Sequence, residues 1–480
     1  MERAHAINFT RLRAVMVGLL LCALALPLLY QAASSAASPA QAALPRCKAL
    51  NTPKDLITSH PSDLAIVQQG YQCILRHYIS GKSLDDRILL RGAFNSLTQS
   101  LGAYAAGITL PALSGNRDAD WRAFATAYDA LAAHFKPLPV VQQLLAEQSL
   151  LGMASSLHDD HTSYLPSDEM KLQISQLTSD APVPSFGFVT SPFDNTTTSL
   201  YLTDIFPSTP AAAAGLKPGD TLETVNGHAL FANGQPDVAG LLAVLFPHMG
   251  TALSLTVLRP VSGANISVRL MPKSLITPAT TARLLPGSIA YVKLYVFTTK
   301  AATQVTAALK RLQRAGPLHG VILDLRGNEG GDADQAVRIL SAFVHDAVVG
   351  YDVNGAGHRH PDRTNNKVAL LHKPVVVLTD GGSASSSELV AGAVRDLHLG
   401  LLVGSRTAGA LAGAEFYGLS DGSGLEITEV HVLGAKAEKV DGIGIAPNQQ
   451  VTTTAADLSA GRDPVIDQAA QDLASAASQG

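Results

Sequence analysis

The sequence predicts a multidomain α/β protein with a helical N-terminal region, a β-rich middle and an α/β C-terminal half. Three observations carry this prediction. Apolar residues recur at three- and four-residue spacing before about residue 175, short strand-like runs lie between turn residues from 182 to 273, and strands alternate with helices from 285 onward. At roughly 150 residues per domain, 480 residues suggest about three folding units.

The composition excludes several classes of protein. Hydrophobic residues make up 46% of the chain and charged residues 15%, so the chain can bury a core and is not disordered as a whole. With 35 Lys and Arg against 39 Asp and Glu, the net charge is -4, and we expect no nucleic-acid partner. Three Cys are too few for a disulfide scaffold or a Cys-rich metal site.

Residues 1–43 have the pattern of a targeting segment. Arg3, Arg11 and Arg13 precede an apolar run over 14–30, and small residues follow it. This pattern predicts a secretory signal peptide or, if it is not cleaved, an N-terminal membrane anchor. Export to the periplasm or cell envelope would place Cys47 and Cys73 in an oxidising space, where they either pair or stay as two unrelated thiols.

The region 45–180 is predicted to be helical, with amphipathic runs over 62–79, 84–101 and 139–157. In the β-rich module, we expect strands over 199–205, 221–225, 253–258 and 266–270, and helices over 210–215 and 236–245. The α/β region is predicted to have strands over 289–297, 320–325 and 374–378, and helices over 300–314, 332–344 and 387–397.

Two loops of the α/β region carry small polar residues directly after predicted strands, at 324–331 and at 379–388. Ligand chemistry in open α/β sheets lies at the carboxyl ends of strands, so both loops are well placed for a site. A Ser that opens a helix there has an exposed hydroxyl beside backbone N–H groups that can hold an oxyanion. From local pattern alone, an N-cap Ser and a Gly-Gly turn explain the same residues.

Four motifs in order resemble the C-terminal processing peptidases, or tail-specific proteases, and their tricorn-like relatives. They are D-L-R-x-N-x-G-G at 324–331, the S-A-S-x-S-E-like turn at 383–388 with an A-G-A-x-x-D helix, D-x-H-T-x-Y-L at 159–165, and D-G-x-G-I-x-P at 441–447. The resemblance covers about 150–451. It implies a crotonase-like α/β serine peptidase core over 280–455, followed by a C-terminal tail at 456–480.

The module at 182–273 looks like a PDZ domain, chiefly through its residues 207–220 and 225–227. The loop with Phe186, Gly187 and Phe188 would bind the terminal carboxylate of a peptide, which would add as a strand. The last apolar side chain of that peptide would enter a pocket near Leu241, Leu242 and Leu245. A β-module that only covers neighbouring surface is the alternative.

One position departs from the family. Many members carry a general-base Lys directly after a T-x-G step, and this chain has Ala410 after Thr407 and Gly409. Similarity to the tricorn-like branch then implies a different base, His161, oriented by Asp441, with Ser385 as the nucleophile. The N–H groups of Gly330 and Ser386 would hold the oxyanion.

Several alternatives remain at the site. Ser383, Ser386 or Ser387 would be the nucleophile if the register is shifted, and Glu415 is a second candidate acid. Glu388 and Arg326 are expected to hold the turn by ion pairing, and His358 and His360 to lie in a solvated polar loop. A metal site at Asp159, Asp160 and His161 is disfavoured because no further ligand cluster supports it.

The resemblance therefore predicts an exported serine endopeptidase that acts on polypeptides with free C-termini and needs no cofactor or metal. The N-terminal segment would allow membrane association. A catalytically inactive homologue that only binds C-terminal peptides, with His161 merely bracing its turn, is the principal alternative. Hydrolysis of small esters by the same triad is a third.

Overall fold

The computed structural model describes residues 45–135, 138–178, 182–193, 197–232 and 234–479. The chain divides into two compact units: unit 1 holds the described residues of 175–413 and 430–479, and unit 2 those of 45–174 and 414–429. The predicted targeting segment at 1–43 lies outside the described residues. None of the described helices has the length and apolar character needed to cross a membrane.

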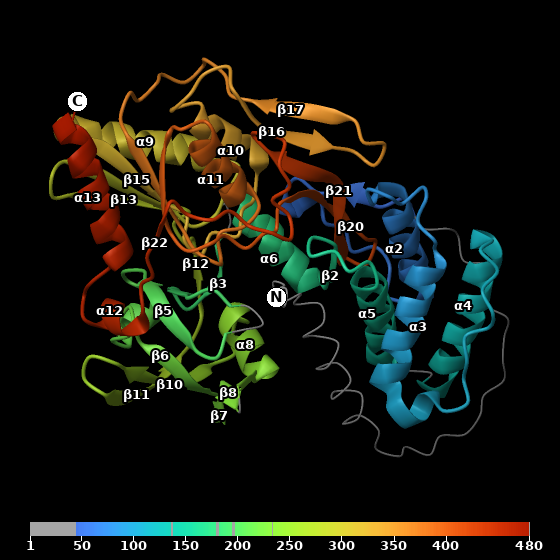
Figure 1. Cartoon of the computed structure of the whole chain (residues 1–480). Helices are drawn as coiled ribbons and strands as arrows, with labels where there is room; N and C mark the ends of the chain where they lie inside the picture. Colours follow the sequence, from blue (N-terminus) through green and yellow to red (C-terminus); the bar gives the residue numbers. More distant parts are fainter. Residues whose placement is uncertain (1–44, 136–137, 179–181, 194–196, 233, 480) are drawn as a thin grey trace. The chain divides into compact units, whose positions relative to one another are not determined.

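Unit 2 is built on a group of helices around one apolar core, drawn from blue to teal in Figure 1. Asp63 and Asn116 cap two of these helices by accepting hydrogen bonds from backbone N–H groups of the first turn. The three predicted helical runs are confirmed, and α4 is an addition to them. The helices are α2 (Leu64–His77), α3 (Arg87–Leu101), α4 (Arg117–Ala132) and α5 (Pro139–Ser155), with 3-10 turns η1 (Pro53–Asp55), η2 (Gly102–Ala105) and η3 (Ala133–Phe135).

Short strands complete unit 2. Strand β1 (Lys48–Ala49) pairs with β20 (Ala412–Gly418), and β2 (Ser163–Leu165) pairs with β21 (Gly424–Gly434). Strand β21 contributes its first half to unit 2 and its second half to unit 1. Helix α6 (Ser167–Thr178) follows β2. The structure also pairs Cys47 with Cys73, which answers the question that the sequence left open.

The β-rich module of unit 1 has a sheet in the order β11-β10-β6-β5-β4, so β4 is its edge strand among the described residues. The buried Asp220 carboxylate, ion-paired with Arg259 at 2.8 Å, ties the turn before β6 to the end of β10. The strands are β3 (Val183–Ser185), β4 (Phe188–Thr190), β5 (Leu200–Ile205), β6 (Thr221–Val225), β7 (His228–Ala229), β8 (Phe231–Ala232), β9 (Gln235–Pro236), β10 (Leu253–Arg259), β11 (Ala264–Leu270) and β12 (Lys273–Leu275), with helices α7 (Pro210–Ala213) and α8 (Val238–Leu245).

The α/β core of unit 1 is a sheet in the order β13-β14-β15-β18-β19-β22, parallel from β14 to β22. Strand β15 is buried along its whole length, as its near-continuous apolar run predicts for a strand covered on both faces. The strands are β13 (Thr280–Leu285), β14 (Ile289–Leu294), β15 (Gly320–Asp324), β18 (Val375–Thr379), β19 (Gly400–Gly404) and β22 (Gln449–Gln450).

Helices cover both faces of this sheet (Figure 1). Helices α9 (Ala301–Arg314), α10 (Ala333–Leu340) and α11 (Ser386–Asp396) contribute to one apolar cluster, and α13 (Pro464–Gln479) contributes to the cluster on the opposite face. A hairpin of β16 (Val348–Val353) and β17 (Arg359–Arg363) pairs with the second half of β21.

Two expectations from the sequence are corrected. The predicted C-terminal tail at 456–480 is mostly helical over its described residues, because α12 (Ala455–Ser459) leads into α13, whose Val465, Ala469 and Leu473 are buried against the sheet. The polar segment with His360 is not a loop, because His360 lies in β17 and pairs with Asp352 of β16. Polar residues on an exposed hairpin give a weak strand pattern, so propensity alone did not identify it.

Candidate active site

The site begins where β15 and β18 end side by side at the carboxyl edge of the parallel sheet. The chain after β18 turns into α11, and Ser385 is the residue at the N-cap of that helix. Its φ of 51° lies in the left-handed region, which is uncommon for a residue other than Gly and costs conformational energy. The side chain is half-buried and remains accessible at the helix start.

The three neighbouring serines are buried and donate their hydroxyls to backbone carbonyls. Ser383 Oγ donates to Leu325 O at 2.8 Å, Ser386 Oγ to Gly331 O at 2.9 Å, and Ser387 Oγ to Asn328 O at 2.8 Å. These bonds join the loop after β18 to the loop after β15. Since these three hydroxyls are used in holding two loops together, the arrangement favours Ser385 over them as a nucleophile.

Glu388 holds the nucleophile turn in place through hydrogen bonds to its carboxylate. Its fully buried carboxylate accepts hydrogen bonds from the N–H groups of Ser385, Gly409 and Ala410, at 3.2, 2.7 and 2.8 Å, and from the Thr407 hydroxyl at 2.5 Å. Burial raises the pKa of the Glu388 carboxyl, and the four donors oppose that rise. Glu388 therefore holds the turn through backbone and hydroxyl donors, and the expected ion pair is not its role.

Gly330 lies directly against Ser385. A Cβ at position 330 would come within 2.7 Å of Ser385 Cβ and 3.1 Å of Ser386 N, and its φ of 107° also favours Gly. The Gly330 N–H, expected to help hold an oxyanion, donates instead to Asn328 Oδ1 at 2.9 Å. The Ser386 N–H occupies the first position of α11, where a helix leaves N–H groups without an intrahelical acceptor.

Asn328 is a residue whose role the motif match did not specify. Its buried side-chain amide donates from Nδ2 to Leu294 O at 2.8 Å and accepts from Gly330 N, so it fixes the loop after β15. Arg326 fulfils its expected ion-pairing role, with Nη2 at 2.7 Å from Asp324 and 2.8 Å from Asp463. Burial acts to raise the pKa of Asp324. The positive charges of Arg326 and Lys293 outweigh this effect and hold the pKa well below its usual range.

The position of the family Lys lies beside the nucleophile. Ala410 O accepts a hydrogen bond from Ser385 N at 2.9 Å, which places the backbone of Ala410 beside the nucleophile turn. Asp441 belongs to the segment that packs on this loop, since Gly442 N donates to Gly409 O at 2.7 Å. The Asp441 carboxylate is half-exposed, with Lys439 Nζ at 4.0 Å.

His161 lies in unit 2, in a turn that Asp159 organises. The Asp159 carboxylate accepts from His161 N and from the Thr162 hydroxyl, each at 2.9 Å. Thr162 is fully buried and also bonds Thr428 of β21. Because His161 belongs to one compact unit and Ser385 and Asp441 to the other, their triad remains a prediction that rests on the two turns taken separately.

The predicted peptide-binding residues of the β-rich module differ in exposure. Phe186 and Leu241 are buried in the module, while Phe188, Leu242 and Leu245 are only half-buried and reach its surface. Gly187 has a φ of 84°, and a Cβ there would come within 2.1 Å of Thr209 Cβ. Its N–H donates to Ser185 Oγ at 3.0 Å. The loop is therefore tightly constrained, and Phe188 begins edge strand β4.

The remaining candidates lie elsewhere. Glu415 is exposed on β20 in unit 2, and His358 and His360 are exposed on the β16–β17 hairpin. Asp159, Asp160 and His161 do not bring three ligand atoms together. Within the described parts of the chain, such a group occurs only at Cys47, Cys73 and His77, in unit 2.

Comparison with known proteins identifies the core. Residues 288–451 match peptidase family S41. The chain is 28% identical over 332 residues to the carboxy-terminal-processing protease of Bartonella bacilliformis, covering 68% of this chain and 73% of that one. It is 30% identical over 319 residues to carboxyl-terminal-processing peptidase 3, chloroplastic, of Arabidopsis thaliana, covering 63% and 60%.

Solved structures agree at the level of the fold. The photosystem II D1 C-terminal processing protease superposes with a TM-score of 0.50 at 20% identity, covering 82% of this chain and 94% of that one. At this identity the likeness shows the fold alone. The motifs at 324–331 and 383–388 both lie within the matched residues 288–451.

Proposed function

We propose that this chain, whose residues 288–451 match peptidase family S41, is an exported serine endopeptidase that cleaves polypeptides with free C-termini. The observation that carries the proposal is the difference in hydrogen bonding and exposure among the four serines near the start of α11. Three donate their hydroxyls to backbone carbonyls, while Ser385 sits half-exposed at the N-cap against Gly330.

The proposed reaction is acyl transfer. Ser385 Oγ attacks the amide carbonyl, His161 takes the hydroxyl proton and later delivers it to the leaving amine, and water releases the acyl group by the reverse sequence. Asp441 would orient the His161 ring. Ala410 supports a histidine base, because a methyl group at this position cannot accept a proton.

The oxyanion would be held at the start of α11. The Ser386 N–H is well suited to this because of its position in the first turn of the helix. The Gly330 N–H would join it only by releasing Asn328 Oδ1, a local change that substrate binding would have to drive. No cofactor or metal is needed for this chemistry.

Recognition of the substrate is assigned to the β-rich module, acting as a PDZ domain. An extended C-terminal peptide would pair with edge strand β4, its carboxylate at the loop before Phe188. The half-buried Leu242 and Leu245 would receive its last apolar side chain. Buried Phe186 and Leu241 would support this pocket from inside the module.

Export is proposed from the N-terminal pattern of residues 1–43, and the Cys47–Cys73 disulfide fits an oxidising compartment. Residues 1–43 would be either a cleaved signal peptide or a retained membrane anchor. In either case the peptidase would act outside the cytoplasm.

The test is cleavage of an unfolded protein that ends in apolar residues, compared with the same protein carrying an amidated C-terminus. The wild-type chain should cleave the free form faster. Ser385→Ala and His161→Gln should each lower kcat by about 10³-fold or more. Ser387→Ala is the matched control, since it removes a buried structural hydroxyl and should retain most activity. Unchanged cleavage by Ser385→Ala, or peptide binding without turnover by the wild type, would overturn the proposal.

A further inference from the structure

A second cluster of reactive side chains lies in unit 2, outside the proposed active site. Cys73 and His77 are four residues apart on α2 and share one face of the helix, and Cys47 reaches them from the segment just before β1. The two sulfurs form a disulfide, with the Cα atoms 6.0 Å apart. The two sulfurs and a ring nitrogen of His77 lie within 4.8 Å of one another.

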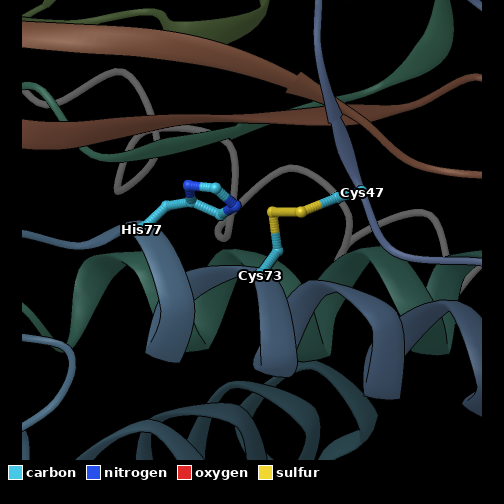
Figure 2. A group of neighbouring side chains, drawn as sticks. All are labelled: Cys47, Cys73 and His77. Carbon is cyan, nitrogen blue, oxygen red and sulfur yellow. A yellow bond between two sulfur atoms is a disulfide. The ribbon is translucent and has the colours of Figure 1, made fainter.

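The His77 ring is held in a defined orientation. Its Nδ1 lies 3.2 Å from Glu429 Oε1, and the Tyr417 hydroxyl donates to the same carboxylate oxygen. The ring also packs on Tyr417, with centroids 4.0 Å apart. Nδ1 is therefore committed to Glu429, and Figure 2 shows the other side of the ring facing the sulfurs.

We propose that, when the disulfide is reduced, Cys47, Cys73 and His77 bind one Zn²⁺ ion. Two thiolates and one imidazole form a ligand set that zinc favours, with its fourth position left to water. A carboxylate on the second nitrogen is the usual partner of a metal-bound His, and Glu429 has that position. Glu429 is then a positioning residue for His77.

The geometry needs little change to accept the ion. Tetrahedral zinc with Zn–S of about 2.3 Å and Zn–N of about 2.0 Å sets ligand atoms roughly 3.5–3.8 Å apart. The sulfurs would separate by roughly 2 Å from their bonded distance, while His77 Nε2 already lies within reach. Rotation of the two Cys side chains supplies this movement without shifting α2.

The reaction balances with a dithiol reductant. The dithiol gives two electrons and two protons to the disulfide, which yields two thiols and the oxidised reductant. Zinc binding then releases both thiol protons. A disulfide oxidant reverses the sequence and expels the ion. The segment before β1 therefore stays linked to α2 in both states, by the disulfide when the chain is oxidised and by the zinc ion when it is reduced.

The experiment uses the full chain, reduced without metal and then freed of reductant under anaerobic conditions. Reduced chain should bind one Zn²⁺ in competition with a chromogenic chelator, and oxidised chain none. Co²⁺ in place of zinc should give a thiolate-to-cobalt charge-transfer band. Cys47→Ser and Cys73→Ser should abolish binding, while His77→Gln and Glu429→Gln should weaken it about 10- to 100-fold.

Cys22→Ser is the matched control, because Cys22 is the third Cys of the chain and is not one of the three proposed ligands. It should leave zinc binding unchanged. His77→Gln keeps both Cys, so it remains informative if a Cys variant does not fold. Reduced wild type that binds no zinc would show a plain structural disulfide, and zinc binding that persists unchanged in His77→Gln would show that His77 is not a ligand. Either result would overturn the proposal. The readout is metal binding, so it is independent of peptidase activity.

Discussion

The turn that carries Ser385 and the turn that carries His161 are each organised by one carboxylate, but to different degrees. Glu388 is fully buried and accepts from four donors, one at residue 385 and three within 407–410. Asp159 is half-buried and accepts from the two residues that follow it closely, His161 and Thr162. The Glu388 carboxylate thus accepts mainly from a segment far along the chain, whereas the hydrogen bonds that Asp159 accepts from His161 and Thr162 are local and only its bond with Tyr78 is long-range. Removing the carboxylate should therefore cost more in the first turn.

The largest effect is expected for Glu388→Gln. The side-chain NH₂ group of the Gln would face N–H groups that need an acceptor. Some of these buried donors would therefore have no hydrogen-bond partner. We expect the free energy of unfolding to fall by about 3 kcal/mol and kcat to fall at least tenfold. Urea denaturation and cleavage kinetics would measure these changes. Exposed Glu223 on β6 is the control, and Glu223→Gln should change stability by less than about 0.5 kcal/mol. Equal effects from both variants would contradict the assignment of Glu388.

The second effect concerns Gly330, which shapes the same turn sterically. Gly330→Ala would place a methyl group within 2.7 Å of Ser385 Cβ and force the nucleophile to move. A shift of this size should lower kcat by about 100-fold, with KM affected less. Gly327→Ala is the matched control, since position 327 also has a positive φ, of 68°, but has no neighbouring atom within 4 Å of the added Cβ. If both variants lose the same activity, the contact with Ser385 is irrelevant.

A smaller effect is expected for Asp159→Asn in the histidine turn. Asn can still accept one of the two hydrogen bonds, so we expect kcat to fall about tenfold and stability by about 1 kcal/mol. Burial and the Asp159 charge together raise the pKa of Tyr78 to about 12, so the variant should also lower that pKa. Ultraviolet titration of the tyrosines would show it. Asp160→Asn, at the adjacent exposed position, should leave kcat, stability and the Tyr78 pKa unchanged. A loss equal to that of Asp159→Asn would show that Asp159 has no special role in holding the histidine turn.

The smallest effect belongs to a carboxyl outside both turns. Burial first, and then the nearby Asp352 charge, raise the pKa of Asp362 on β17 to about 6, while His360 opposes the rise. Between the ordinary pKa of 3.8 and about 6, the folded chain binds more protons at Asp362 than the unfolded chain, so this contribution to stability falls as pH increases. Allowing for solvent screening at a half-exposed site, Asp362→Asn should add about 1 kcal/mol at pH 7.

Urea midpoints near pH 4.5 and pH 7 would test this last prediction. The gain from Asp362→Asn should be large at pH 7 and small near pH 4.5, because the carboxyl is protonated in the folded chain at the lower pH. Asp346→Asn provides a comparison at an exposed position. A gain that is independent of pH would show that the Asp362 charge is not responsible.

Motifs and periodicity predicted the parts of this molecule that depend on local sequence. Strand β15, helix α9 and the position of Ser385 at the start of α11 follow from apolar runs, Gly punctuation and a recognised motif. The partners of Glu388 could not be predicted this way, because Thr407, Gly409 and Ala410 come close only through the pairing of β18 with β19 and the loop beyond it. Helix α13 was missed for the same reason, since its buried face is defined by a sheet formed far earlier in the chain.

The central claim is that Ser385 is the nucleophile, and covalent labelling tests it most directly. A serine-directed fluorophosphonate should modify the folded wild-type chain, and mass spectrometry of its peptides should place one adduct on Ser385. Labelling should fall sharply in His161→Gln, which removes the proposed base. An adduct on Ser383, Ser386 or Ser387, or no adduct on a folded chain that still cleaves its substrate, would contradict the account.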